Sequence, residues 1–234
     1  MTSAIGVSRR WFINKGLGFI ADKVSEYSGI SELFLPPPLE ATFLYYHDIS
    51  YLKLKLDLLN LMRQWYQPIS IGTLIGHFKG EQPIPKNQPV FLLTLDDGKK
   101  SQYEAVLRAT EEVEKETKWF IPANFFIMTN FNETPTSEIP YISGNTPSYD
   151  SKSLSRDEIV DLLKQRHEVY NHTINHSKLT TLDVGKRNDE VENGEKRVDV
   201  LWDLAGRKKQ YKVLAYPYGL YNGQLIQYLQ DLKY

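Results

Sequence analysis

The chain has 234 residues and contains no cysteine, which excludes disulfide bonds and thiolate metal ligands. A metal ion in this protein would therefore be held by carboxylate and imidazole groups. No apolar run reaches the roughly 20 residues that a membrane-spanning helix needs. The 28 basic and 29 acidic residues give a net charge of −1, so charge gives no indication of nucleic acid or an anionic membrane as a partner. We therefore expect a neutral or small partner.

The length suits one domain preceded by a short leader. Residues 1–38 are expected to form a mainly helical leader that ends in the stiff Pro36-Pro37-Pro38 run, and residues 39–234 the main domain. The segment 8–13 resembles a twin-arginine export signal. The apolar stretch after it is interrupted at Asp22 and Lys23, so the leader contains no convincing signal peptide.

Short β-prone runs alternate with segments of helical periodicity along residues 39–234. Strands are expected at 42–46, 90–95, 123–128, 169–170 and 212–216, and helices at 51–65, 101–117, 159–166, 184–205 and 222–232. Residues 129–153, which are rich in Pro, Ser, Thr and Asn, are expected to form a loop near the functional site. Strands that alternate with helices predict an α/β fold with a parallel sheet.

Two acidic residues, Asp96 and Asp97, follow the buried run at 90–95, and Gly98 permits a sharp turn after them. Adjacent carboxylates repel one another, which indicates a cation or a shared proton. His172 and His176 follow the run at 169–170, and a helical turn would bring both to one face. One carboxylate and two imidazoles are a common donor set for a divalent ion, and the second carboxylate could take a proton from water.

Each motif alone has an ordinary alternative. An Asp-Asp-Gly triplet is often a plain turn, and two histidines four residues apart are often surface residues. Their position at the ends of two separate strands favours the joint interpretation as a metal site.

The sequence resembles the polysaccharide deacetylases of the chitooligosaccharide deacetylase type. The family's TFDDG motif corresponds to residues 94–98, with Leu95 in place of Phe, and its H[ST]xxH motif corresponds to residues 172–176. Residues 214–219 (Leu-Ala-Tyr-Pro-Tyr-Gly) are similar to the family's FAYPYG variant. The Tyr45-Tyr46-His47 segment resembles the YH motif of the poly-β-1,6-N-acetylglucosamine deacetylase branch.

The resemblance implies a distorted (β/α) barrel with a parallel sheet, expected to be incomplete because one or two more strands would follow residue 234. It implies Asp97, His172 and His176 as ligands of one divalent metal ion, with zinc first and cobalt, nickel or manganese as alternatives. Asp96 would be the general base. The backbone N–H of Tyr218 would help to hold the oxyanion, and Pro217 and Tyr216 belong to the same substrate-binding segment.

The general acid is less directly indicated, because the late histidine motif of many family members does not occur in this sequence. His47 follows the early strand, so it should lie at the same end of the sheet as Asp96 and His172. Active sites of barrels lie at this end. His77 has no strand leading into it, and His167 precedes its strand. We therefore expect His47 to act as the acid, the alternative being a core histidine bonded to backbone.

The predicted function is metal-dependent removal of N-acetyl groups from N-acetylglucosamine units of a polysaccharide or oligosaccharide. The resemblance implies an extracytoplasmic or cell-envelope location. Three positions depart from the family pattern: Ala215 replaces a frequent Arg, Tyr170 a usual Gly, and Lys99 a residue that is often aromatic. Ala215, Tyr170 and the expected truncation keep open an alternative from another class, a catalytically silent glycan-binding protein on the same fold.

Overall fold

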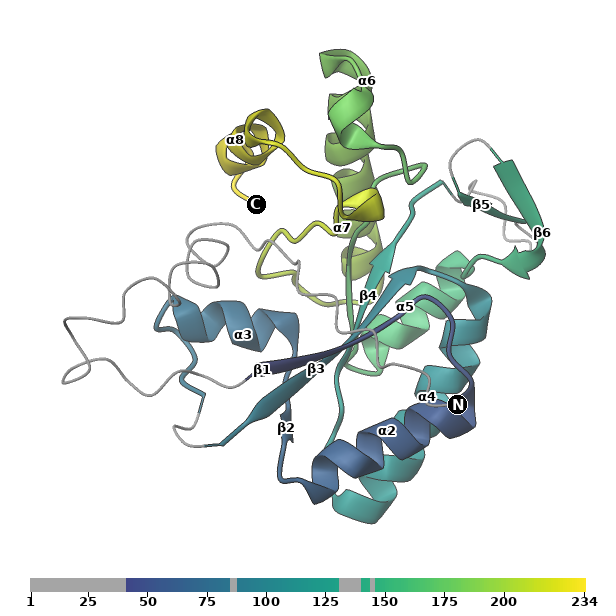
Figure 1. The fold of residues 1–234 in the computed structure, drawn as a ribbon, viewed down its shortest axis with the longest axis vertical. Helices are drawn as coiled ribbons and strands as arrows, with labels where there is room; N and C mark the ends of the chain where they lie inside the picture. The colour runs from purple at the N-terminus through teal and green to yellow at the C-terminus, as the bar shows by residue number, and fades with distance from the viewer. Residues whose placement is uncertain (1–40, 85–87, 131–139, 144–145) are drawn as a thin grey trace.

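The structure is a computed structural model that describes residues 41–84, 88–130, 140–143 and 146–234. Its central sheet contains the parallel strands β1 (Ala41–Tyr46), β3 (Val90–Asp97), β4 (Ala123–Ile127) and β7 (Glu168–Asn171) in the order β1-β3-β4-β7 (Figure 1). The short strand β2 (Gln67–Pro68) also pairs with β3. The predicted α/β fold with a parallel sheet is confirmed. The predicted leader, residues 1–38, lies outside the described residues.

Helices surround this sheet, and their bounds are α2 (Tyr51–Arg63), α3 (Ile71–Phe78), α4 (Lys100–Thr117), α5 (Arg156–Lys164), α6 (Val184–Asn188), α7 (Gly194–Leu204) and α8 (Gly223–Asp231). A π-helical turn η2 (Asp189–Asn193) joins α6 to α7. Short 3₁₀ turns are η1 (Leu179–Thr181) and η3 (Pro217–Gly219). The strands β5 (Pro140–Ser143) and β6 (Thr146–Lys152) form a separate antiparallel pair. No helix in the described ranges is long and apolar enough to cross a membrane.

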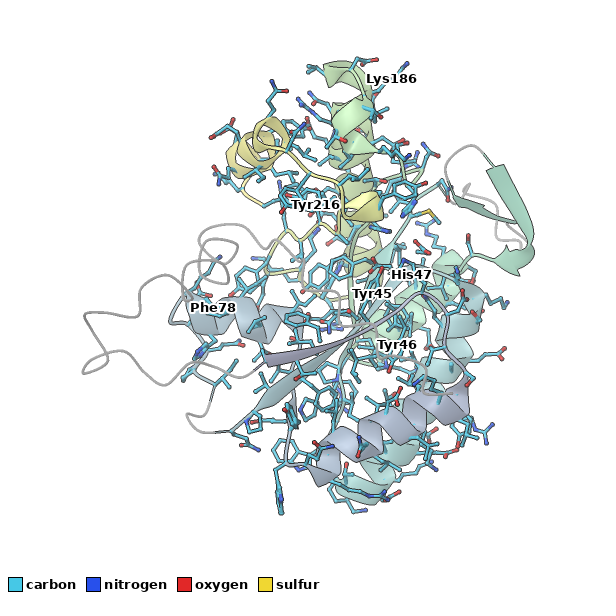
Figure 2. The ribbon with its side chains drawn as sticks, viewed as in Figure 1. Tyr45, Tyr46, His47, Phe78, Lys186 and Tyr216 are labelled. Atoms are coloured by element: carbon cyan, nitrogen blue, oxygen red, sulfur yellow. The ribbon has the colours of Figure 1, made fainter. Side chains whose placement is uncertain are left out.

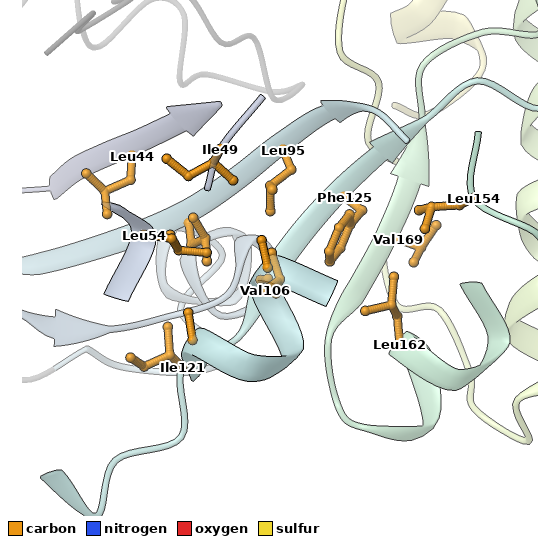
Figure 3. Close-up of a cluster of buried hydrophobic side chains, with 14 of the residues drawn as sticks. Leu44, Ile49, Leu54, Leu95, Val106, Ile121, Phe125, Leu154, Leu162 and Val169 are labelled. Atoms are coloured by element: carbon orange, nitrogen blue, oxygen red, sulfur yellow. The ribbon is translucent and has the colours of Figure 1, made fainter. Parts of the chain in front are cut away.

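All eight residues of β3 are buried, which explains the nearly continuous apolar run in the sequence. Phe91, Leu93 and Leu95 face one cluster of apolar side chains, which they form with residues of α2, α4, α5 and α7 (Figure 3). Val90 and Leu92 face the other side, where α3 and the chain around residues 213–215 pack. Asp96 lies on the same face of the sheet as Val90 and Leu92, because successive side chains along a strand point to opposite faces.

The strand register brings the carboxyl ends of neighbouring strands together. Asp97 pairs with Ile127 of β4, and Ile127 pairs with Asn171 of β7. Tyr46, the last residue of β1, pairs with Leu95. Residues that follow these strands therefore meet at one edge of the sheet, where the sequence predicted the site.

Three predicted elements differ from the structure. The predicted strand at 212–216 is reduced to one parallel bridge between Asn171 and Leu214. The predicted helix at 184–205 is interrupted by η2. The predicted loop at 129–153 contains β5 and β6 in its described part. Periodicity and composition do not specify such local departures, because tertiary contacts decide them.

Candidate metal centre and active site

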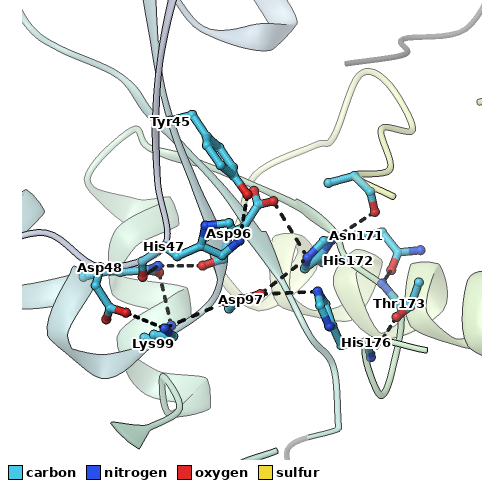
Figure 4. Close-up of polar contacts among 12 residues, drawn as sticks. Tyr45, His47, Asp48, Asp96, Asp97, Lys99, Asn171, His172, Thr173 and His176 are labelled. Atoms are coloured by element: carbon cyan, nitrogen blue, oxygen red, sulfur yellow. Dashed lines mark hydrogen bonds and ion pairs between the residues drawn. The ribbon is translucent and has the colours of Figure 1, made fainter. Parts of the chain in front are cut away.

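Asp97, His172 and His176 meet at the carboxyl ends of β3 and β7, and all three are buried (Figure 4). One ligand atom from each residue lies within 4.8 Å of those of the other two. Asp97 Oδ1 lies 3.5 Å from His172 Nε2 and 3.6 Å from His176 Nε2. The structure thus brings together the three residues that the sequence predicted as a metal-binding set.

The spacing of these atoms fits a shared ion. The two N···O distances are longer than ordinary hydrogen bonds, whereas ligand atoms about 2.0 Å from one tetrahedral ion lie about 3.3 Å from each other. His172 Nδ1 bonds to the Ala215 carbonyl at 2.9 Å, which leaves Nε2 to face the site. His172 Nε2 is buried and has no hydrogen-bond partner among the described residues. The donor set therefore suits a divalent cation.

Electrostatics in the cluster favour a positive charge. Burial by itself would lower the pKa of His172, but the negative charges of Asp96 and Asp97 outweigh it, and the pKa is raised overall. Burial, assisted by the neighbouring His172, lowers the pKa of His176 to about 4. His176 is therefore neutral near pH 7, as a ligand must be. A cation between these groups would offset the repulsion between the carboxylates.

The expectation that His172 and His176 share one face of a helical turn is wrong. Residues 172–176 form a non-helical bend in which Thr173 and His176 have φ of 68° and 56°. Asn171 Oδ1 accepts from Thr173 N at 2.8 Å, and Thr173 Oγ1 accepts from His176 N at 3.0 Å. These bonds fold the chain back, so that the two rings lie 4.7 Å apart between centroids.

Asp96 lies beside the cluster, with Oδ2 3.8 Å from His172 Nε2. Burial raises the pKa of Asp96 to about 7, and the adjacent Asp97 contributes to the rise. Its Oδ1 is buried with no hydrogen-bond partner among the described residues. Asp96 thus places a carboxylate beside His172, and one oxygen atom of that carboxylate accepts no hydrogen bond from the described residues.

His47 follows β1 and lies at the same edge as Asp96 and Asp97 (Figures 2 and 4). Its Nε2 is 2.7 Å from the Tyr45 hydroxyl, and the two rings meet edge to face. Burial lowers the pKa of His47, and the charges of Asp97 and Lys99 act on it in opposite directions. The side-chain amide of Gln102 donates to the carbonyl groups of His47 and Asp96, at 2.9 and 2.6 Å, and so ties both segments together.

Lys99 occupies the position that is often aromatic in the family pattern. Its Nζ forms an ion pair with Asp48 Oδ2 at 2.6 Å and lies 4.0 Å from Asp97 Oδ2. The lysine therefore places a positive charge at the rim of the site.

The predicted substrate-binding residues occupy η3 and the chain before it. Tyr218 is 51% exposed, and its ring lies 4.5 Å from that of His176. Its φ of 59° is left-handed, which is uncommon for a residue other than glycine. Pro217 is buried, and the half-buried Tyr216 packs against Tyr221. Of these three residues, Tyr218 is the one whose ring packs against His176, a predicted metal ligand.

His77 and His167 have structural partners away from the cluster. His77 Nδ1 accepts from Ile84 N at 2.9 Å. His167 Nδ1 accepts from Ala123 N at 3.1 Å, at the opposite ends of β4 and β7 from the site. Neither contact involves the residues around Asp97.

Three residues of the site were missed from the sequence: Gln102, Asn171 and Glu190. The Asn171 side chain accepts a hydrogen bond from the backbone two residues later and so forms a local turn. Asparagine often forms such turns, so the sequence could have indicated this role. Gln102 bonds the carbonyl groups of His47 and Asp96, and Glu190 accepts from the backbone N–H groups of Ile174 and Asn175. Both act over tertiary contacts, and no sequence motif indicates them.

Comparisons with known proteins identify the family and the fold of the chain. The family model for polysaccharide deacetylases matches residues 84–234. The solved structure of the Streptococcus pyogenes deacetylase PplD in complex with acetate is similar, with a TM-score of 0.62 and 17% identity over 86% of this chain and 82% of that chain. IcaB from Ammonifex degensii gives a TM-score of 0.60 and 19% identity, covering 84% of this chain and 82% of the other.

The deacetylase domain of BpsB from Bordetella bronchiseptica gives a TM-score of 0.56 and 18% identity, covering 76% and 74% of the two chains. At these identities the likeness shows a shared fold. A search of curated protein sequences found no match.

Proposed function

Since the chain belongs to the polysaccharide deacetylase family, whose members hydrolyse amide bonds of acetylated carbohydrates, we propose that it is a metal-dependent N-deacetylase of a polysaccharide built from N-acetylglucosamine. The observation that carries the metal dependence is the buried cluster of Asp97, His172 and His176. The nitrogen and oxygen donors favour zinc, with cobalt, nickel or manganese as alternatives.

Asp97 Oδ1 and the Nε2 atoms of His172 and His176 would hold the ion. Such an ion polarises the acetamide carbonyl and makes a water molecule more acidic. In this proposal Asp96 takes the proton from the attacking water. Its position beside the ligands and a pKa of about 7 without metal suit a general base that works near neutral pH.

The proposal assigns the general acid to His47. The Tyr45 hydroxyl fixes the ring, and the position after β1 places it on the same edge as the ligands. Because burial lowers its pKa, a protonated His47 would release its proton readily to the departing amine.

The backbone N–H of Tyr218 is the proposed donor to the oxygen that becomes negative as water attacks. The left-handed φ of Tyr218, after the buried Pro217, fixes the direction of this peptide group next to His176. The exposed Tyr218 ring offers an apolar surface to a sugar. Tyr216 supports this segment by packing on Tyr221.

For the substrate we propose a β-1,6-linked polymer of N-acetylglucosamine. The Tyr45-Tyr46-His47 segment and its position at the site support this choice. Such a polymer implies an extracytoplasmic or cell-envelope location.

A second candidate is a silent glycan-binding protein with the same fold. It is favoured by Ala215, which stands where many family members have an arginine that orients the base. Tyr170, another of the three departures, has a structural explanation: its hydroxyl donates to Glu168 at 2.7 Å and its ring packs on Phe126.

Acetate release separates the two candidates. The purified chain is stripped with a chelator, divided, and reloaded with zinc or cobalt before incubation with N-acetylglucosamine oligomers of β-1,6 and β-1,4 linkage. The proposed function predicts metal-dependent acetate release, faster with the β-1,6 oligomer. Oligomer binding without acetate release under any metal would establish the silent alternative.

A further inference from the structure

The bend between His172 and His176 is held in an unfavourable backbone conformation. Thr173 and His176 both have left-handed φ, a conformation that is unfavourable for residues other than glycine and persists only where the surrounding structure imposes it. The bonds of Asn171 and Thr173 described above fix the start of the bend and His176 N. They leave residues 174, 175 and 177 to be fixed by something else.

Glu190 supplies that constraint. Its Oε2 accepts from the backbone N–H groups of Ile174 and Asn175, at 2.9 and 2.8 Å. Its Oε1 accepts from Asn175 Nδ2 at 2.8 Å and from Ser177 Oγ at 3.0 Å. One carboxylate therefore binds four donors, all from the segment that lies between the two histidines or directly follows them.

The position of Glu190 is itself built into the fold. It is 8% exposed and belongs to η2, the π-helical turn between α6 and α7. Hydrogen bonds to a buried carboxylate are about twice as strong as neutral ones. The neighbouring Val191 carbonyl accepts from Asn171 Nδ2 at 2.9 Å, so the same turn also holds the residue that starts the bend. Isolated π-helical turns are often found at functional sites.

We propose that Glu190 is a positioning residue that keeps His176 in register with His172 and Asp97 as a metal ligand. This inference rests on the proposed metal site. It assigns Glu190 no contact with substrate or metal, and its effect passes through the backbone of residues 174–177. Groups that orient metal ligands typically contribute 10- to 100-fold to affinity.

Cobalt binding and amide exchange test the proposal together. Metal-free parent, Glu190→Ala and Glu190→Gln are titrated with CoCl₂, and the visible spectrum of the bound ion is recorded. Glu190→Ala is expected to weaken binding about 10- to 100-fold and to change the spectrum, because His176 is no longer fixed. Glu190→Gln keeps one acceptor oxygen for the backbone pair, so its loss should be smaller. In metal-free protein, the amides of Ile174 and Asn175 should exchange faster in Glu190→Ala.

Two controls separate positioning from general destabilisation. Glu192→Gln changes a residue of the same turn that bonds Tyr228 instead, and Val113→Ala removes buried methyl groups from α4. Both should retain the parent's cobalt affinity and spectrum. If Glu190→Ala does not fold, the cobalt affinity and spectrum of Glu190→Gln test the proposal instead.

Parental affinity and spectrum in a folded Glu190 variant would overturn the inference. If the parent itself fails to bind cobalt, the proposed metal site is wrong, whereas amide exchange still reports whether Glu190 holds the bend.

Discussion

Asp96 and Asp97 are consecutive in the chain, yet their carboxylates have different surroundings. Asp97 has a φ of 76° at the end of β3, which turns its side chain toward both histidines. Asp96 remains in step with the strand and reaches only the edge of the cluster. The backbone turn at Asp97 thus allows two adjacent acids to have separate roles.

Asp96→Asn tests this separation. The amide keeps the shape of the side chain but cannot take a proton from water, so deacetylation should fall by roughly 10² to 10⁴. Metal content, measured on the same preparation, should equal that of the parent. Loss of the metal together with activity would mean that Asp96 is a ligand, and the roles of the two residues would be exchanged.

His47→Ala tests the assignment of the acid. Turnover should fall by roughly 10² to 10⁴, while metal affinity stays within a few-fold of the parent. His77→Ala is the matched control: the His77 ring accepts from Ile84 N, away from the site, so this variant should keep full turnover per folded molecule. Full activity of His47→Ala would leave the amine to be protonated by another group.

At the scale of elements, the turn η2 and the bend at 172–176 pack closely. A Cβ atom on Gly194, at the start of α7, would lie 2.8 Å from Asn171 Oδ1, the oxygen that accepts from Thr173 N. The close approach of the Asn171 side chain therefore requires a glycine at position 194.

Gly194→Ala is expected to lower the free energy of unfolding by about 1 to 3 kcal/mol and to weaken cobalt binding, because Asn171 must shift. Gly185→Ala in α6 is the control. Its added carbon would lie 3.5 Å from Asp183 Oδ1, an ordinary contact, so stability should be unchanged or slightly raised. Denaturant unfolding and a cobalt titration measure both effects. Equal stability of Gly194→Ala and the parent would show that Asn171 is not tightly held.

The elements that the sequence predicted well are those with local signals. The apolar run before Asp96 is β3, and the helix predicted at 159–166 corresponds to α5, which begins after the capping box of Ser155 and Glu158. The helical turn expected for His172 and His176 was wrong because spacing alone does not distinguish a helix from a bend. The bend depends on Asn171, Thr173 and Glu190, and the last of these reaches it through a tertiary contact.

At the scale of the whole molecule, the carboxyl ends and the amino ends of the parallel strands have different roles. The carboxyl ends carry the candidate site, and the opposite ends of β4 and β7 are joined through the buried His167. Burial lowers the pKa of His167 to about 4, and the charges of Arg166 and Arg207 act in the same direction. The folded protein therefore keeps this histidine neutral at pH values where an unfolded chain protonates it.

Stability should consequently fall as the pH falls below about 6.5, the ordinary histidine pKa. Between that value and pH 4 the unfolded state binds more protons, so acid favours unfolding. For His167 the loss between pH 7 and pH 5 is about 2 kcal/mol. Urea unfolding of metal-free parent and His167→Gln measures it, and the variant should show a pH dependence that is shallower by this amount. Identical slopes would contradict the neutral, buried state of His167.

The central claim is that Asp97, His172 and His176 bind one divalent ion together. The most direct test is a cobalt titration of the metal-stripped parent beside His176→Ala, with His77→Ala as a control for loss of a histidine elsewhere. The parent and His77→Ala should bind one equivalent, and His176→Ala should lose most of it, because two remaining protein ligands rarely hold a labile ion. Undiminished stoichiometric binding by His176→Ala, or no binding by the parent, would contradict the claim.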